Sequence, residues 1–172
     1  MSDGRYSFRS ATRVDLPMLR RWLETPAVAR WWSDPDKQYA LLEQDLGDPR
    51  MVMRIVSFRE RPFAYAQDYD IYSWGDADHF DGLPEGTRAI DVFIGEPDMI
   101  GRGHGSRFIR ILAERLRQEG APLVAIDPDV TNVRARRAYE KAGFKLESFV
   151  ETAEGPAALM LFERGAWGAT KE

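Results

Sequence analysis

A glycine-rich loop, IGRGHGSRF at residues 100–108, is the segment whose composition most clearly suggests chemistry. Gly101, Gly103 and Gly105 stand at alternate positions, and a helical pattern follows directly. Glycines leave the backbone N–H groups unobstructed by side chains, and the start of a helix adds positive potential. Such a loop can bind a pyrophosphate, although three small residues can also form a plain connection between a strand and a helix.

Two other glycine-loop chemistries do not fit this spacing. The dinucleotide-binding fingerprint G-x-G-x-x-G requires a final glycine where Ser106 or Phe108 stands. The phosphate loop of nucleotide hydrolases ends in G-K-[ST], a sequence that the segment lacks. What remains is G-x-G-x-G between a strand and a helix, a pattern that favours a pyrophosphate-binding turn.

Asp91 is a carboxylate inside the strand-like run TRAIDVFIG, which is otherwise rich in apolar residues. Strand alternation predicts Ile90, Val92 and Ile94 on one face, with Asp91 and Phe93 on the other. Burial of an ionised carboxylate is costly without a partner. The sequence therefore predicts that Asp91 has a partner, either within the protein or in a ligand.

The charges are divided unevenly along the chain. From Asp68 to Asp98 there are nine acidic residues and one arginine, Arg88, whereas Met99 to Lys145 contains ten basic and five acidic residues. One part of the molecule is expected to attract cations and the other anions. The switch between the two falls at the glycine loop.

The composition indicates a single domain spanning residues 1–172. The chain has 172 residues and is 44% hydrophobic, enough for one core. It contains no run of about 18 apolar residues and no signal-peptide pattern, so we expect no membrane association and a cytoplasmic protein. Without cysteine there is no thiolate chemistry, and with two histidines we expect no metal site.

Hydrophobic periodicity predicts helices and strands in the order β-α-α-α-β-β-β-α-β-α-β-β, which is typical of an α/β domain with a mixed sheet. Asp15 is expected to cap the first helix, with Leu16, Leu19 and Leu23 on one face. The segment GDADHFDGLPEG is expected to form an exposed acidic loop. The other elements are expected at residues 6–12, 27–32, 37–46, 51–58, 62–74, 87–95, 106–118, 122–127, 132–142, 144–151 and 156–163.

A second motif, IDPDVTNVRARRAYEKAGF at residues 126–144, follows the glycine loop and narrows its interpretation. It places Asn132 at a helix start, Arg136 and Tyr139 inside the helix and Gly143 at its end. A G-x-G-x-G turn opening a helix, then a strand, then N-x-x-A-x-x-x-Y-x-x-x-G-F, resembles the GNAT superfamily of acetyl-CoA-dependent N-acetyltransferases. Within that superfamily the chain resembles aminoglycoside 6′-N-acetyltransferases. The resemblance spans nearly the whole chain through RWLETPAVARWW, FAYAQDYD, AIDVFIGEPDMIGRGHG and GPAALMLFE.

The resemblance implies a GNAT fold, an α/β (α+β) domain whose mixed, mostly antiparallel sheet is flanked by helices, and acetyl-CoA as co-substrate. Backbone amides of the loop would bind the pyrophosphate, and the strand of Asp91 would pair with the pantetheine arm and polarise the thioester carbonyl. Ile100 departs from the Gln or Arg that usually begins the loop. The implied cofactor-binding residues are Phe93, Ile94, Arg102, Gly103, His104, Gly105, Ser106, Asn132 and Arg136.

The resemblance also implies two catalytic residues, Asp91 and Tyr139. Asp91 would orient the acceptor amine and take its proton, directly or through water, or only anchor it. Tyr139 would protonate the departing thiolate, because a thiol pKa of about 8.5 is close enough to the pKa of about 10 of a phenol. No covalent acyl-enzyme is expected.

The implied acceptor is a cationic small-molecule amine. Trp32 is expected to form an aromatic wall of the acceptor site, since one of two neighbouring helical tryptophans should point away from the core. Tyr65 and Tyr69 are expected to share a strand face, and Asp127 is either a second substrate carboxylate or a turn residue. The expected substrate-binding residues are Trp32, Tyr65, Tyr69, Asp91 and Asp127.

The favoured function is acetylation of the 6′-amine of an aminoglycoside, which would confer antibiotic resistance. Related aminoglycoside enzymes carry tryptophans and glutamates where this chain has ADHFD, so the acceptor stays open. The alternatives are a siderophore hydroxylysine, a protein amine, or a non-catalytic coenzyme A-binding module, which would need neither Asp91 nor Tyr139. We expect a monomer or homodimer that binds no nucleic acid, given the net charge of −4.

Overall fold

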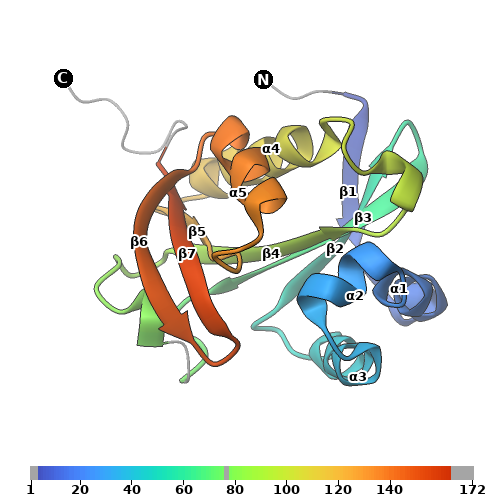
Figure 1. Cartoon of the computed structure of the whole chain (residues 1–172), viewed down its shortest axis with the longest axis horizontal. Helices are drawn as coiled ribbons and strands as arrows, with labels where there is room; N and C mark the ends of the chain where they lie inside the picture. The colour runs from blue at the N-terminus through green and yellow to red at the C-terminus, as the bar shows by residue number, and fades with distance from the viewer. Residues whose placement is uncertain (1–3, 76–77, 164–172) are drawn as a thin grey trace. The chain divides into compact units, whose positions relative to one another are not determined.

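The computed structural model describes residues 4–75 and 78–163. Within these residues the helices and strands follow the predicted order, and three short 3₁₀ turns are added (Figure 1). None of the described helices combines the length and hydropathy that a bilayer-spanning helix requires. The strands are β1 (Tyr6–Ser10), β2 (Val52–Phe58), β3 (Arg61–Asp70), β4 (Arg88–Ile94), β5 (Val124–Ile126), β6 (Lys145–Thr152) and β7 (Gly155–Phe162). The helices are α1 (Leu16–Leu23), α2 (Pro26–Trp32), α3 (Pro35–Asp45), α4 (His104–Gln118) and α5 (Val133–Ala142), and the 3₁₀ turns are η1 (Arg13–Asp15), η2 (Asp78–Phe80) and η3 (Pro97–Met99).

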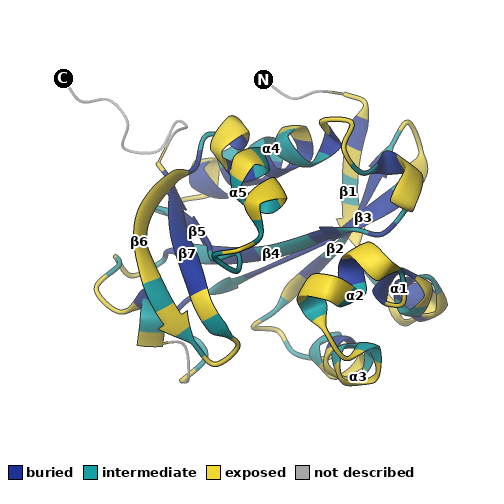
Figure 2. Ribbon diagram, in the orientation of Figure 1, coloured by how far each residue is buried: buried dark blue, intermediate teal, exposed yellow. Residues whose placement is uncertain are grey.

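The strands form one sheet in the order β1-β2-β3-β4-β5-β7-β6. β4 and β5 run parallel, with Arg88 opposite Val124, whereas the β1–β2, β2–β3, β5–β7 and β6–β7 pairs are antiparallel. The prediction of a mixed, mostly antiparallel sheet is therefore confirmed. Figure 2 shows that β7 is buried along most of its length while β6 is largely exposed, as expected for an edge strand.

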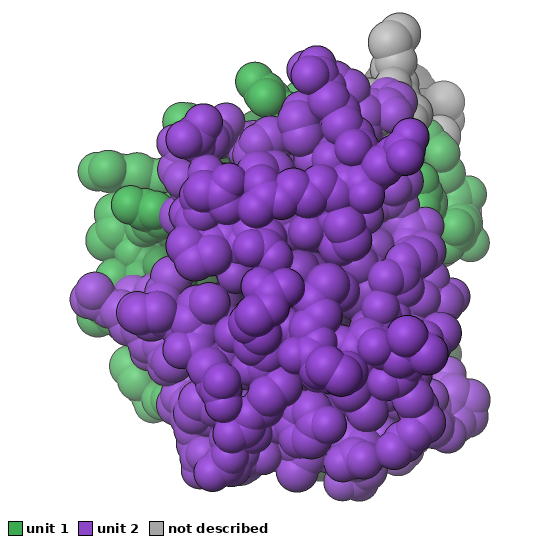
Figure 3. Space-filling view, turned by 90° about the vertical axis from the view of Figure 1, so that its right-hand side faces the viewer, with its two compact units in different colours: residues 1, 69–90, 105–172 green, residues 2–68, 91–104 purple. Residues whose placement is uncertain are grey.

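The chain divides into two compact units (Figure 3). One comprises residues 1, 69–90 and 105–172, and the other residues 2–68 and 91–104. β3 and β4 each contribute residues to both units, so the division does not follow the ends of the strands. The single domain expected over residues 1–172 stays a prediction.

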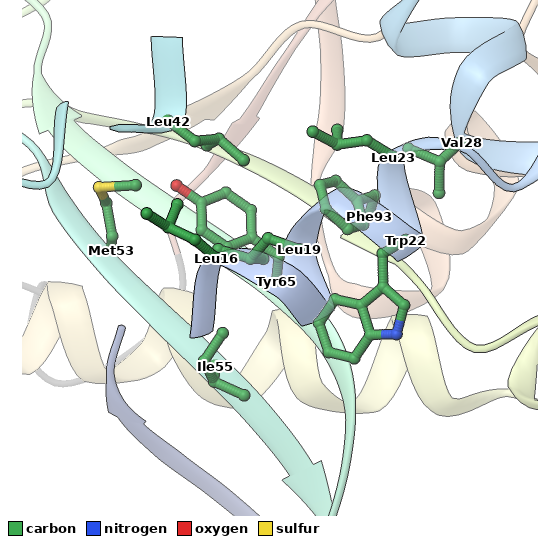
Figure 4. Close-up of a cluster of buried hydrophobic side chains, with 10 residues drawn as sticks. All are labelled: Leu16, Leu19, Trp22, Leu23, Val28, Leu42, Met53, Ile55, Tyr65 and Phe93. Carbon is green, nitrogen blue, oxygen red and sulfur yellow. The ribbon is translucent and has the colours of Figure 1, made fainter. Parts of the chain in front are cut away.

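The unit of residues 2–68 and 91–104 has a core between α1, α2, α3 and the strands (Figure 4). Leu16, Leu19 and Leu23 of α1 are buried, as the helical spacing predicts. Trp22 is fully buried and lies against Gly95, where a Cβ atom would come within 2.1 Å of its ring. A glycine is therefore required just after β4.

The unit of residues 69–90 and 105–172 has its own apolar cluster, to which one residue of the acidic segment belongs. The described residues of GDADHFDGLPEG are mostly exposed, as predicted, but the segment contains η2, and Phe80 at the end of η2 is fully buried. Residues 76 and 77 lie outside the described part of the chain. The Phe80 ring anchors the segment because it joins buried side chains from other elements, namely Ile71, Ala89, Ala125, Leu159 and Leu161.

Two helices begin two residues earlier than the sequence predicts. α3 begins at Pro35 rather than Lys37, because the Asp34 side chain accepts hydrogen bonds from two backbone N–H groups of the first turn. α4 begins at His104 rather than Ser106. The end of the glycine loop is therefore the first turn of a helix.

Asp15 occupies the N-cap position of α1, but its side chain makes no hydrogen bond to that helix, which corrects one prediction. Its carboxylate instead accepts a hydrogen bond from the Thr12 N–H at 2.8 Å and two from Arg9 at 2.7 and 2.8 Å. The Arg9 guanidinium lowers the pKa of the Asp15 carboxyl below its ordinary value. The helical turn begins earlier than predicted, at η1, where Thr12 is the N-cap and Asp15 is the third residue of a capping box, so the Asp15 carboxylate bonds to the Thr12 N–H rather than to the N–H groups of α1.

Candidate active site

Asp91 lies opposite Gln67 in the antiparallel pairing of β3 and β4. Gly95 N–H donates to the Phe63 carbonyl, and this register sets residue 67 against residue 91. Gln67 Nε2 donates a hydrogen bond to Asp91 Oδ2 at 2.9 Å. The predicted partner of the strand carboxylate is thus found inside the protein, on the neighbouring strand.

Phe93 shares this face of β4 and forms an aromatic group with Tyr65 and Trp32. The Phe93 ring stacks on Tyr65 with centroids 5.3 Å apart, and Trp32 meets Phe93 edge-on at 5.0 Å. Trp31 points the other way, is 36% exposed and lies under the guanidinium of Arg30. Of the two tryptophans, Trp32 is therefore the one beside the strand of Asp91.

Tyr65 is fully buried, and hydrogen bonds through Gln67 link its hydroxyl to Asp91. Its hydroxyl donates a hydrogen bond to Gln67 Oε1 at 2.6 Å. Burial, and after it the charge of Asp91, raise the pKa of Tyr65 well above its ordinary value. Sequence reasoning expected Tyr65 as a substrate contact and missed Gln67, although alternation along AYAQDYD sets both on one strand face.

The glycine loop has the backbone that its sequence suggests. Gly101 and Gly103 adopt positive φ angles of 79° and 84°, which side chains disfavour. Arg102 between them is exposed, and Gly105 and Ser106 lie in the first turn of α4. N–H groups of a first helical turn have no acceptor four residues earlier in the helix, and alternating backbone conformations make a concave N–H surface. The backbone of the loop is therefore compatible with the predicted pyrophosphate-binding turn, and the binding role of its residues stays a prediction.

His104 has a structural role that the sequence did not reveal. Its ring is buried, with Nδ1 2.6 Å from the hydroxyl of Tyr6. The rings of Phe58 and Phe63 lie 4.6 and 5.4 Å from it. The expected backbone role of His104 is compatible with this, because its side chain anchors the start of α4 while its amide stays in the first turn.

The predicted residues Asn132, Arg136 and Tyr139 stabilise helix α5 and its packing. Asn132 accepts a hydrogen bond from the Ala135 N–H at 3.2 Å and is the N-cap. Arg136 donates to the Val130 carbonyl at 2.9 Å and lies over the ring of Phe149. Tyr139 is 8% exposed, so its ring is mostly packed into the protein.

Asp127 follows β5 and has a partner in the acidic segment. His79 Nε2 lies 2.7 Å from Asp127 Oδ2, and both side chains are mostly buried. Tyr69 packs partly buried against the apolar cluster that contains Phe80. Nearby residues of the same unit, Asp70, Tyr72, Leu83, Glu85 and Gly86, line an open hollow of about 500 Å³. Across residues 4–75 and 78–163, no cluster of three or more His, Asp or Glu side chains has the arrangement of a metal site.

Most of the chain is similar to known proteins. A family model described as an acetyltransferase (GNAT) domain matches residues 11–152. An aminoglycoside N(6′)-acetyltransferase type 1 of Klebsiella pneumoniae is 31% identical over 182 residues, covering 99% of this chain and 89% of that protein. A kanamycin resistance protein of Rhizobium radiobacter is 37% identical over 87 residues, covering 50% of this chain and 81% of that protein.

A solved aminoglycoside 6′-N-acetyltransferase structure is also similar to this chain in fold and sequence. AAC(6′)-Ib in complex with ribostamycin and coenzyme A is 31% identical, with a TM-score of 0.81, covering 92% of this chain and 93% of that chain. The expected fold is therefore confirmed.

Proposed function

Because the chain belongs to the GNAT family of acetyltransferases, we propose that it transfers the acetyl group of acetyl-CoA to the 6′-amine of an aminoglycoside. The observation that carries the proposal is the Asp91 carboxylate, held by Gln67 beside the aromatic group of Trp32, Tyr65 and Phe93. A carboxylate next to aromatic faces suits an ammonium group on a sugar.

Acetyl-CoA would supply the activated acetyl group as a thioester. The backbone of residues 102–106 would hold its pyrophosphate, which the positive φ angles of the loop and the start of α4 support. Asn132 and Arg136 would line the same co-substrate from α5. Backbone groups of Phe93 and Ile94 would hold the pantetheine arm, since β4 pairs with β5 through Arg88 and Ala89 and these two residues lie beyond that pairing.

Two side chains of this protein would transfer protons during the reaction, one as a base and one as an acid. Asp91 accepts a proton from the acceptor ammonium, directly or through a water molecule, and thereby prepares the amine for attack. Tyr139 donates a proton to the leaving sulfur, which a phenol can do because the two pKa values differ by roughly 1.5 units. The reaction then proceeds by direct attack, without an acyl-enzyme.

The acceptor would be recognised by aromatic surface and negative charge. Trp32 would form a wall of the amino-sugar site, with Tyr65 packed against its ring. Tyr69 and Asp127 are further proposed contacts of the acceptor. The hollow lined by Asp70 and Glu85 supports this assignment, because two carboxylates at an open surface attract polycations. A cytoplasmic location and a monomer or homodimer stay part of the proposal.

A panel of acceptors tests the function through coenzyme A release. We expect turnover with aminoglycosides that carry a 6′-amine and none with an aminoglycoside that carries a hydroxyl there. Asp91→Asn should abolish most of the turnover yet leave the rise in Tm produced by acetyl-CoA intact. Turnover only with peptides or hydroxylysine derivatives would replace the aminoglycoside, and absence of the Tm rise would remove acetyl-CoA itself.

A further inference from the structure

Gln67 lies between Tyr65 and Asp91 in a chain of two hydrogen bonds. The Tyr65 hydroxyl donates to Gln67 Oε1 at 2.6 Å, and Gln67 Nε2 donates to Asp91 Oδ2 at 2.9 Å. We propose that Gln67 is a positioning residue whose amide, oriented by Tyr65, keeps Asp91 ionised and fixes the direction of its carboxylate. The proposal rests on the function proposed above, in which Asp91 receives the proton of the acceptor.

Tyr65 decides which end of the Gln67 amide faces Asp91. A hydroxyl that donates must meet the carbonyl oxygen of the amide, which leaves the NH₂ group for the carboxylate. An N–H donor stabilises the ionised carboxylate relative to the protonated acid. The opposite amide orientation would set Oε1 against a carboxylate oxygen without a proton between them.

Packing holds Tyr65 in this arrangement. Its ring is fully buried, stacks on Phe93 at an interplanar angle of 29° and meets the edge of Trp32. Burial raises the pKa of Tyr65 well above its ordinary value, so the group remains a hydroxyl that can donate. The aromatic group therefore orients the amide as well as forming a wall.

Negative charges around Tyr65 also keep its hydroxyl protonated. Asp91, Asp45 at the end of α3 and Asp68 of β3 all raise the pKa of Tyr65. Asp68 is paired with Arg54 of β2. Nearby negative charges disfavour a phenolate, so the Tyr65 hydroxyl remains the donor to Gln67.

The pH dependence of kcat/KM with a 6′-amino acceptor tests the proposal. Gln67→Met keeps the length of the side chain and removes the amide, so Asp91 should ionise at higher pH. We expect the acid limb of the kcat/KM profile to move to higher pH by about one unit, while kcat/KM above that limb changes little. Tyr65→Phe keeps the ring and removes the hydroxyl, and it should shift the acid limb in the same direction by a smaller amount.

Two controls separate positioning from a general structural effect. Gln118→Met makes the same change at the exposed end of α4 and should leave the profile unchanged. The rise in Tm with acetyl-CoA should persist in all variants. A loss of kcat/KM that is equal at every pH, or an unshifted acid limb, overturns the proposal.

Failure of the proposed function would look different. If Asp91→Asn retains the wild-type rate and profile, or no acceptor is turned over, the function itself is wrong. If Asp91→Asn is inactive while Gln67→Met behaves as wild type, only the role of Gln67 is wrong. Should Gln67→Met fail to fold, Tyr65→Phe decides, and an unshifted profile in that variant overturns the proposal.

Discussion

His79 and Asp127 contact each other at 2.7 Å, and this contact ties the acidic segment to the end of β5. Their side chains are only 13% and 19% exposed. The ring of His79 also lies 4.0 Å from that of Phe80, which is fully buried. The carboxylate that sequence reasoning offered to a substrate ammonium therefore already has a partner within the protein.

Replacing His79 with Ala should strengthen binding of polycationic acceptors. An acceptor ammonium must compete with His79 for Asp127, and a hydrogen bond of about 1 kcal/mol corresponds to roughly a fivefold lower KM without it. Steady-state kinetics with one aminoglycoside measure this, and His79→Gln, which retains a donor, is the control. A higher KM in His79→Ala would show that the imidazole helps to bind the acceptor.

Replacing Tyr139 with Phe should lower kcat by about 10²- to 10⁴-fold, the usual contribution of a general acid. The ring can keep its packing near Phe144, 6.2 Å away, so the protein should fold and acetyl-CoA should still raise its Tm. Tyr39→Phe removes a hydroxyl from a half-buried side chain of α3, outside the proposed site, and serves as the control. Unchanged turnover in Tyr139→Phe would remove Tyr139 from the mechanism.

Replacing Gly95 with Ala should destabilise the protein by about 1–3 kcal/mol or more, because the new Cβ would overlap the ring of Trp22. That ring lies 2.1 Å from the Cβ position and is fully buried, so it cannot move aside without disturbing the core. Urea denaturation measures the change. Gly47→Ala, where the nearest atom is 3.9 Å away, should be nearly neutral.

Replacing Asp15 with Asn should reduce stability at neutral pH and much less in acid. The pKa of Asp15 is lowered in the folded protein by Arg9, so its charge contributes stability above about pH 4, and this contribution is lost as the pH falls through the folded value. We expect the unfolding free energy of Asp15→Asn to be about 1 kcal/mol below that of the wild type at pH 7, and this difference to disappear towards pH 2. Asp98→Asn, in an exposed pair with Arg61, should show little gap at either pH. A gap for Asp15→Asn that does not depend on pH would contradict the assignment.

The order of elements and part of the site were predictable because they depend on local sequence. The cap at Asn132, the glycines before α4 and the shared face of Asp91 and Phe93 each follow from a few neighbouring residues. The GNAT fold followed from the combination of the loop with the motif around Tyr139. Patterns that repeat over a few residues predict secondary structure without knowledge of contacts to distant parts of the chain.

The features that sequence reasoning missed all depend on distant partners. Gln67 acquires its importance from Asp91 on another strand, and His79 from Asp127 nearly fifty residues later. His104 is a loop residue in sequence, but its side chain joins Tyr6, 98 positions away. Ordinary polar residues carry no local signature of such pairings.

The alternation along β4 limits how this strand can change over evolution or in the laboratory. Asp91 and Phe93 share one face, and an insertion or deletion of one residue before them would turn both to the opposite face and bring Val92 and Ile94 in their place. Point substitutions on this strand keep its register, whereas any change in its length before Asp91 should abolish the proposed acetyl transfer and be lost from a selected library.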